Sequence, residues 1–224
     1  MPGEATHRLR VAVLISGRGS NMAALIEAAS DKSYPAEIVL VLSNRADAGG
    51  LDIARANGIA TAVVDHKTYG KDRAAFDDAM QAVLDEHRIE LVCLAGFMRL
   101  LSAPFVERWQ GRMLNIHPAL LPAFKGLDTH RRAIEAGATV HGATVHFVVP
   151  EMDSGPIIAQ AAVPVRSGDT EAALAARVLE VEHRIYPAAL KLVAEGRVRI
   201  SGGRCLIDDR PAPEAAELVP DRGP

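Results

Sequence analysis

Three polar residues suited to acyl transfer stand around two short motifs in the middle of the chain. Asn115 and His117 end a short apolar run, and Asp153 follows another apolar run at residues 143–149. Alternate side chains of a strand share a face, so Asn115 and His117 point the same way, and Pro118 ends the strand. An amide can donate to an oxyanion, an imidazole can move protons near neutral pH, and a carboxylate can orient the imidazole. The pattern is compatible with an acyl-transfer site.

The same motifs also have a purely structural interpretation. A strand can simply end in His117-Pro118, and Asp153-Ser154-Gly155 can form an ordinary turn. Spacing alone favours this structural interpretation, so the catalytic hypothesis needs support from the rest of the chain.

A glycine-rich turn, Ser16-Gly17-Arg18-Gly19-Ser20-Asn21, joins an apolar run at 9–15 to a helical pattern that starts at Met22. Glycines let the backbone approach a ligand closely, and a helix N-terminus offers unpaired N–H groups and a positive dipole end. Ser20 or Asn21 can either cap this helix or contact an anion. The turn lacks the dinucleotide pattern and the Gly-Lys-Ser/Thr end of a Walker loop. It favours a phosphate monoester as ligand, with a simple tight turn as the alternative.

Composition limits the classes of protein that this chain can belong to. Its 224 residues carry a formal net charge of −3, and 24% of them are charged. This profile is typical of a globular protein and argues against a nucleic-acid binder that relies on a strong positive field. The apolar run at 11–15 is too short for a signal peptide or a membrane span. Cys93 and Cys205 show no metal-ligand spacing and are expected to be buried thiols in a reducing cytoplasm.

Short apolar runs alternate with helical patterns, which predicts an α/β fold: a single Rossmann-like domain with a mostly parallel twisted sheet flanked by helices. The expected strands are 9–15, 38–42, 59–64, 91–95, 112–117, 143–149 and 157–165. One expected helix starts at Met22, and the others span 47–56, 68–86 and 172–193. The last of them is expected to be broken or bent near Pro187. A hairpin is expected over 198–207. Residues 1–7 and 208–224 are predicted to be disordered, which leaves a domain over 8–207.

Six segments, in order over residues 9–207, closely resemble the phosphoribosylglycinamide formyltransferase family of folate-dependent enzymes. They are residues 16–21, 95–99, 114–122, 142–147, 152–156 and 182–187. The resemblance implies transfer of the formyl group of 10-formyltetrahydrofolate to the amine of glycinamide ribonucleotide in purine biosynthesis. The products would be formylglycinamide ribonucleotide and tetrahydrofolate. The resemblance makes the catalytic interpretation of Asn115, His117 and Asp153 the favoured one.

The resemblance also implies which residues bind the two substrates. Gly19, Ser20 and Asn21 would hold the ribonucleotide phosphate, and Glu182 would also contact this substrate. The implied folate-binding residues are Arg73, Met98, Arg99, Leu100, Leu101, Asn115, Val149, Pro150, Glu151, Met152 and Asp153. From the residues alone, the apolar loop at 96–101 suits the wall of a pocket for a flat ring or the start of a packed helix. Arg73 and Glu182 could equally be solvated residues on helix surfaces.

The implied mechanism is direct attack of the substrate amine on the formyl carbon, which gives a tetrahedral intermediate with an oxyanion. Asn115 and protonated His117 would stabilise this oxyanion, and Asp153 would favour the imidazolium form and help to relay protons. The reaction needs no metal and no covalent enzyme intermediate. Other histidines lack metal-ligand spacing: His130, His141, His146 and His183.

Three other functions compete with this one. Methionyl-tRNA formyltransferases resemble the chain around its Asn-x-His-Pro and Asp-x-Gly motifs but carry a further C-terminal domain. Formyltetrahydrofolate hydrolases add an N-terminal domain, and the length of the chain disfavours both. A non-catalytic binding module on the same scaffold is disfavoured because His117 and Asp153 are present. We expect small-molecule substrates, no nucleic acid, no membrane, and a monomer or homodimer.

Overall fold

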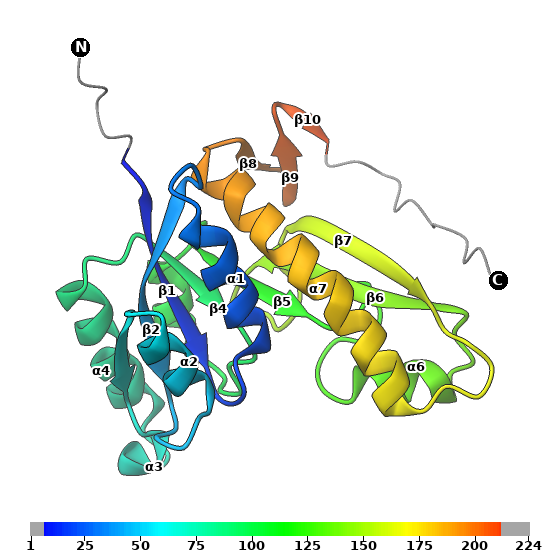
Figure 1. Ribbon diagram of the computed structural model, residues 1–224, viewed down its shortest axis with the longest axis horizontal. Coiled ribbons are helices and arrows are strands. Elements are labelled where there is room, and N and C mark those ends of the chain that lie inside the picture. Colours follow the sequence, from blue (N-terminus) through cyan, green and yellow to red (C-terminus); the bar gives the residue numbers. More distant parts are fainter. Residues whose placement is uncertain (1–6, 212–224) are drawn as a thin grey trace.

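The computed structural model describes residues 7–211, which build a seven-stranded sheet with helices on both faces (Figure 1). The strand order is β3-β2-β1-β4-β5-β6-β7. Neighbours from β3 to β5 are parallel, and β6 and β7 run antiparallel to their neighbours. The predicted mostly parallel sheet is therefore confirmed. The strands are β1 (Leu9–Ile15), β2 (Ala36–Ser43), β3 (Ala60–Val63), β4 (Leu91–Leu94), β5 (Met113–His117), β6 (Val140–Phe147) and β7 (Ile157–Pro164).

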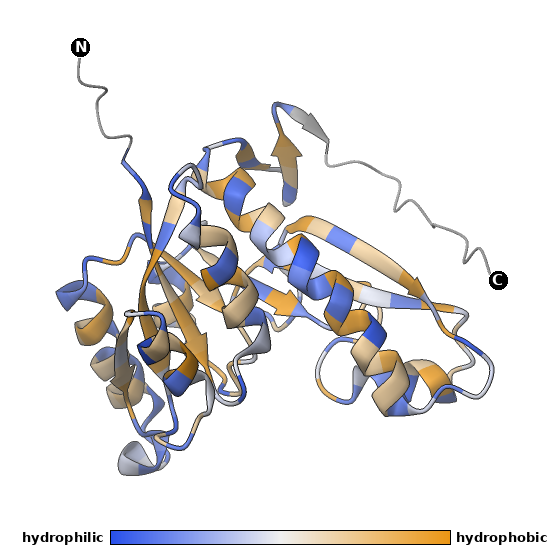
Figure 2. Cartoon of the chain, in the orientation of Figure 1, coloured by the Kyte–Doolittle hydropathy of each residue, from blue (hydrophilic) through white to orange (hydrophobic). Residues whose placement is uncertain are grey.

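The sheet separates two hydrophobic clusters, because successive side chains of each strand point to opposite faces. Along β1, Val13 joins the first cluster and Leu14 the second. The central strands are therefore hydrophobic along most of their length (Figure 2). Helices α1 (Ser20–Ser30), α2 (Gly50–Ala56), α6 (Thr129–Glu135) and α7 (Glu171–Ala194) cover the first face. Helices α4 (Arg73–Glu86) and α5 (Ala103–Arg108) cover the second.

Two predicted helices differ from the observed ones. The segment predicted as one helix over 68–86 is split into α3 (His66–Tyr69) and α4, because Gly70 has a φ of +57° and ends the first helix. Asp72 then accepts a hydrogen bond from the Ala75 amide and caps the second helix. The predicted break near Pro187 is wrong, since α7 continues through it. Burial of α7 against α1 and the sheet outweighs the one backbone hydrogen bond that proline removes.

A small three-stranded sheet follows α7 and confirms the predicted hairpin. It consists of β8 (Val198–Ser201), β9 (Arg204–Ile207) and β10 (Arg210–Pro211). Arg210–Pro211 pairs with β9, so this sheet continues past residue 207, the predicted end of the domain. His7, predicted to be disordered, makes a side-chain contact with Glu90. The rest of the predicted disordered segments, residues 1–6 and 212–224, lie outside the described residues.

Among residues 7–211, no helix is both long enough and apolar enough to cross a membrane. Cys93 and Cys205 are buried and unpaired, as the sequence predicts.

Candidate active site

The site is built at the point where the order of the parallel strands reverses. The first strand, β1, lies between β2 and β4, so the chain leaves it in one direction along the sheet and later continues in the other. Ligands of open α/β sheets bind at such points, beyond the carboxyl ends of the strands. The glycine-rich turn follows β1, the apolar loop at 96–101 follows β4, and His117 ends the neighbouring β5. The topology therefore brings the predicted phosphate, folate and catalytic segments to one edge of the sheet.

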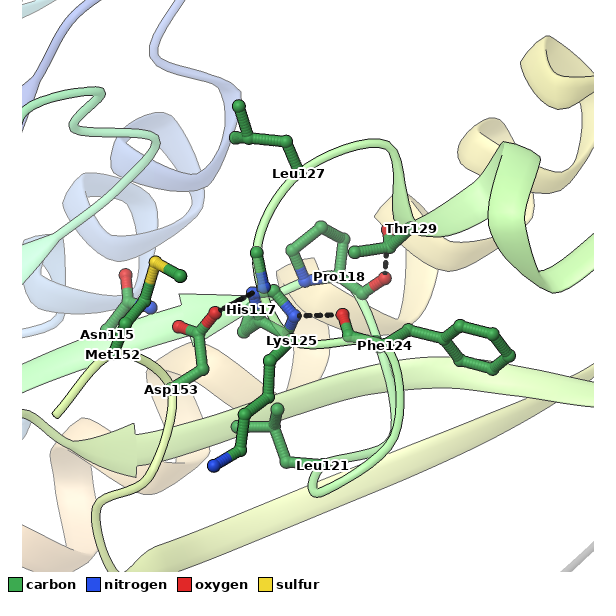
Figure 3. Close-up of polar contacts among 12 residues, drawn as sticks. Asn115, His117, Pro118, Leu121, Phe124, Lys125, Leu127, Thr129, Met152 and Asp153 are labelled. Atoms are coloured by element: carbon green, nitrogen blue, oxygen red, sulfur yellow. Dashed lines mark hydrogen bonds and ion pairs between the residues drawn. The ribbon is translucent and has the colours of Figure 1, made fainter.

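His117 is buried between two hydrogen-bond acceptors (Figure 3). Its Nε2 atom lies 3.0 Å from the carbonyl oxygen of Phe124, and its Nδ1 atom lies 3.5 Å from Oδ2 of Asp153. A carbonyl oxygen can only accept, so Nε2 carries a proton. The negative carboxylate faces the other nitrogen and is placed to stabilise a proton there. The pair therefore has the geometry of an imidazole that an acidic group orients.

Asp153 is itself held by the loop that follows β5. Its backbone has a positive φ of 50°, and its Oδ2 atom accepts a hydrogen bond of 2.8 Å from the Gly126 amide. On the same two loops, Lys125 Nζ donates to Ser154 Oγ over 2.5 Å. These contacts fix the loop around residue 126 onto the loop at 148–156. The loop after β5 thus positions both His117 and Asp153.

Asn115 is oriented by His146, which stands directly opposite it on β6. The Nδ2 atom of Asn115 lies 3.2 Å from His146 Nε2, and His146 Nδ1 lies 2.8 Å from the Phe147 carbonyl oxygen. Burial lowers the pKa of His146, so its ring is neutral near pH 7 and donates through Nδ1 to that carbonyl. Its Nε2 is then free to accept from Asn115. The amide keeps one N–H and its oxygen for a ligand.

The glycine-rich turn has the backbone conformation of an anion site. Gly19 stands at the N-cap of α1 with a φ of +75°, and no side chain caps the helix. Ser20 and Asn21 therefore leave the first N–H groups of α1 unpaired by side chains, which favours the anion-binding alternative over the capping one. A Cβ atom at Gly19 would lie 2.9 Å from the Cα of Gly50, so the turn has no room for a side chain there.

Glu182 lies beside this turn and is buried, so its interpretation as a solvated helix residue is wrong. Its Oε2 atom accepts a 2.8 Å hydrogen bond from Nδ2 of Asn21. Burial raises the pKa of Glu182, and the hydrogen bond from Asn21 opposes that rise. The structure thus joins three predicted ribonucleotide residues, Gly19, Asn21 and Glu182, in one region.

Exposed apolar side chains gather on the loops predicted to bind folate. Met98 is 63% exposed, Leu100 59% and Met152 54%, and Leu127 on the loop after β5 is 69% exposed. Large exposed hydrophobic side chains of this kind mark binding surfaces. The helix-start alternative is wrong for 96–101, because α5 begins only at Ala103. The other predicted folate residues on these loops are Arg99, Leu101, Val149, Pro150 and Glu151.

Arg73 is the exception among the predicted site residues. It is the exposed first residue of α4. Within residues 7–211 no hydrogen bond or ion pair joins it to the other predicted site residues. Its role in folate binding stays a prediction.

The residues that hold the predicted catalytic group, Phe124, Gly126 and His146, are not among the site residues predicted from the sequence. Phe124 and Gly126 contribute backbone atoms, and His146 was interpreted only as a histidine without metal-ligand spacing. Phe124 also has a positive φ of 52°, which its residue type does not predict. For His146, the sequence indicates only that it lies in an apolar run expected to be a strand, and it does not indicate which residue stands opposite.

Comparison with known proteins gives the family. A model of the formyl transferase family matches residues 9–190. The phosphoribosylglycinamide formyltransferase of Escherichia coli strain K12 is 44% identical over 205 residues, which are 92% of this chain and 96% of that protein. The crystal structure of glycinamide ribonucleotide transformylase 1 from Symbiobacterium toebii has a TM-score of 0.87 at 48% identity, covering 90% of this chain and 94% of that one.

A much longer animal protein is also similar. The human trifunctional purine biosynthetic protein adenosine-3 is 55% identical over 193 residues, which are 86% of this chain but 19% of that protein. The chain therefore spans about a fifth of the length of this relative. The family match, the full-length bacterial similarity and the shared fold agree. The chain belongs to the formyl transferase family, among the phosphoribosylglycinamide formyltransferases.

Proposed function

We propose that this protein transfers the formyl group of 10-formyltetrahydrofolate to the amine of glycinamide ribonucleotide, in de novo purine biosynthesis. The observation that carries the proposal is the buried His117 imidazole, whose two nitrogens face Asp153 and the Phe124 carbonyl. This group lies at the sheet edge that also carries the uncapped N-terminus of α1 and the exposed apolar loops. The Escherichia coli relative is a phosphoribosylglycinamide formyltransferase, and this chain matches 96% of its length, which supports the same reaction.

The proposed reaction begins when the substrate amine attacks the formyl carbon. The carbonyl π bond becomes an oxyanion, and the nitrogen of the amine becomes positively charged. Asn115 N–H donates to the oxyanion, and protonated His117, whose two nitrogens face Asp153 and the Phe124 carbonyl, stabilises it through its positive charge. A proton then moves from the attacking nitrogen to N10 of the folate, the bond between N10 and the formyl carbon breaks, and the carbonyl re-forms. Asp153 favours the protonated ring during these steps.

The two substrates use different physical chemistry in this proposal. The phosphate of the ribonucleotide accepts hydrogen bonds from the first N–H groups of α1, where the helix dipole favours negative charge. Gly19, Ser20 and Asn21 hold this phosphate, and Glu182 contacts the same substrate. The flat ring of the folate lies against Met98, Leu100 and Met152, which are exposed without it. The proposal uses the folate as co-substrate and assigns no metal.

Oligomeric state and location stay predictions. We propose a monomer or homodimer in the cytoplasm; the two buried and unpaired cysteines suit such a reducing compartment. The proposal concerns formyl transfer alone and includes no other activity of the trifunctional animal relatives.

A steady-state assay tests the proposal. Purified protein is incubated with 10-formyltetrahydrofolate and glycinamide ribonucleotide, and the deformylated folate is followed by absorbance, with a control that omits the ribonucleotide. Turnover only with both substrates is expected. Folate release without the ribonucleotide would indicate a hydrolase instead. No turnover, in folded protein that still binds tetrahydrofolate, would indicate a binding module.

A further inference from the structure

The hydroxyl group of Ser16 connects the two loops that bind the substrates in the proposed function. Ser16 is buried at the end of β1, where the glycine-rich turn begins. Its Oγ atom accepts a 2.7 Å hydrogen bond from the backbone amide of Met98 and donates one of 2.6 Å to Oδ1 of Asn44. Met98 opens the exposed apolar part of the loop after β4. A single side chain therefore joins β1, β2 and the folate loop.

This connection crosses the switch point of the sheet. Parallel strands β1 and β4 are neighbours, but no backbone ladder continues between them after Ala95 donates to the Leu14 carbonyl. Ligands of open α/β sheets bind beyond such a point. Ser16 bridges the two loops there through its hydrogen bond with the Met98 amide. The buried Asn44 fixes the Ser16 hydroxyl from the side of β2, so that its lone pair faces the Met98 amide.

The two loops depend on Ser16 to different degrees. The glycine-rich turn has anchors of its own, since the Gly50 amide donates to the Gly17 carbonyl over 3.0 Å. The folate loop is held at its far end by Asp77, whose carboxylate accepts from the Ser102 amide over 2.8 Å. Between Ala95 and Ser102, the loop backbone makes one hydrogen bond to the rest of residues 7–211, and that bond is the one from the Met98 amide to Ser16. Removing it frees the segment that carries Met98.

We propose that Ser16 is a positioning residue for folate binding. Its hydroxyl holds the apolar loop at 98–101 against the strand that carries the phosphate turn. The inference rests on the proposed function, because that function assigns the loop to the folate. Replacement by alanine leaves the Met98 N–H and the oxygen of the buried Asn44 side chain without this partner, and the loop gains alternative conformations. Folate binding must then order the loop first, which weakens affinity.

The test compares Ser16→Ala with the unmodified protein in calorimetric titrations with tetrahydrofolate and, separately, with inorganic phosphate. We expect Ser16→Ala to weaken tetrahydrofolate binding about tenfold and to raise KM for 10-formyltetrahydrofolate by a similar factor. Phosphate binding should stay within about twofold, since the glycine-rich turn keeps its own anchors.

Ser43→Ala is the matched control. Ser43 is a buried serine at the end of the neighbouring strand β2, and its hydroxyl accepts from the Arg45 amide and touches neither substrate loop. We expect this variant to bind tetrahydrofolate as the unmodified protein does. Ser16→Thr, which keeps the hydroxyl, should restore most of the affinity that Ser16→Ala loses.

Two outcomes would overturn the inference: unchanged tetrahydrofolate affinity in Ser16→Ala, or equal losses for phosphate and tetrahydrofolate. If Ser16→Ala does not fold, Ser16→Cys, of similar size but with a much weaker hydrogen bond, is tested in the same way. Failure of the proposed function would be distinguishable, because the unmodified protein would then lack turnover with both substrates whatever the behaviour of the variants.

Discussion

The two halves of the site differ in the groups that they offer to a ligand: one offers mainly backbone groups, and the other offers side chains. In the parallel half, around β1 and β4, the proposed function assigns most of the binding to the backbone: Gly19 allows a tight turn, and no side chain caps the first N–H groups of α1. In the antiparallel half, around β5 and β6, it assigns the chemistry to side chains, which contacts distant in sequence hold. Asn115 depends on His146, 31 residues away. The proposed phosphate site is thus a local structure, whereas the proposed catalytic group exists only in the assembled sheet.

If this contrast is correct, replacing His117 by alanine gives the largest effect on turnover and leaves the phosphate site intact. We expect kcat to fall about a thousandfold, because the ring that stabilises the oxyanion and moves the proton is lost. The measurement is steady-state kinetics with both substrates, together with a phosphate titration. His87→Ala, a histidine at the end of α4, is the control. A kcat within a few-fold of the unmodified protein would remove His117 from the mechanism.

Stability at low pH gives a second test, because the antiparallel half also buries His141. This ring is 1% exposed and packs edge-on against the rings of Phe124 and His130. Burial lowers its pKa from 6.5 to about 4. As pH falls, the unfolded chain takes up the proton first, so stability is lost from about pH 6.5 downward and the loss is complete below about pH 4.

The expected loss is roughly 3 kcal/mol of unfolding free energy, measured by denaturant unfolding across this pH range. His130, whose pKa is also lowered by burial, adds to the loss with the same sign. His141→Leu should flatten the dependence. An identical pH dependence in His141→Leu and the unmodified protein would show that His141 is not the titrating group.

Asp153→Asn tests whether the negative charge of Asp153, and not only its hydrogen bond to the loop after β5, is needed for catalysis. Asparagine keeps an oxygen for the Gly126 amide but removes the negative charge that faces Nδ1 of His117. We expect kcat to fall about a hundredfold. The ring also loses the carboxylate that faces its Nδ1 atom, so the dependence of the rate on pH should change. The full pH–rate profile is the measurement, and an unaltered profile with full activity would contradict the role of Asp153.

Gly19→Ala should affect mainly the parallel half and give the smallest change. The new Cβ would meet Gly50 at 2.9 Å, and alanine disfavours the φ of +75°. We expect KM for the ribonucleotide to rise about tenfold, with a smaller change in kcat. Gly17→Ala is the matched control, since a Cβ there meets nothing within 4 Å. Equal effects of both substitutions would mean that the conformation of Gly19 has no special role.

The same contrast explains what the sequence could predict. The turn at 16–21 and the alternation of Asn115 and His117 are local patterns, and the topology at the sheet edge follows from the order of strands and helices. Contacts across strands are not local. The pairing of Asn115 with His146 depends on the register of β5 and β6, and a change of one residue in that register would abolish it.

Some features could not be predicted because tertiary packing decides them. Phe124 adopts a positive φ value that its residue type disfavours, yet it directs its carbonyl at His117. Glu182 looks like a surface residue on a long helix but is buried beside Asn21. Pro187 signals a break, although α7 packs along the sheet as one helix. In each case the surrounding structure overrides the local preference.

The fate of the formyl carbon tests the central claim most directly. The protein is given 10-formyltetrahydrofolate labelled at this carbon, together with glycinamide ribonucleotide, and the products are separated after a single turnover. Direct transfer predicts that the label appears in the ribonucleotide product in step with tetrahydrofolate, with no labelled formate. Label recovered as free formate, with the ribonucleotide unmodified, would contradict the account.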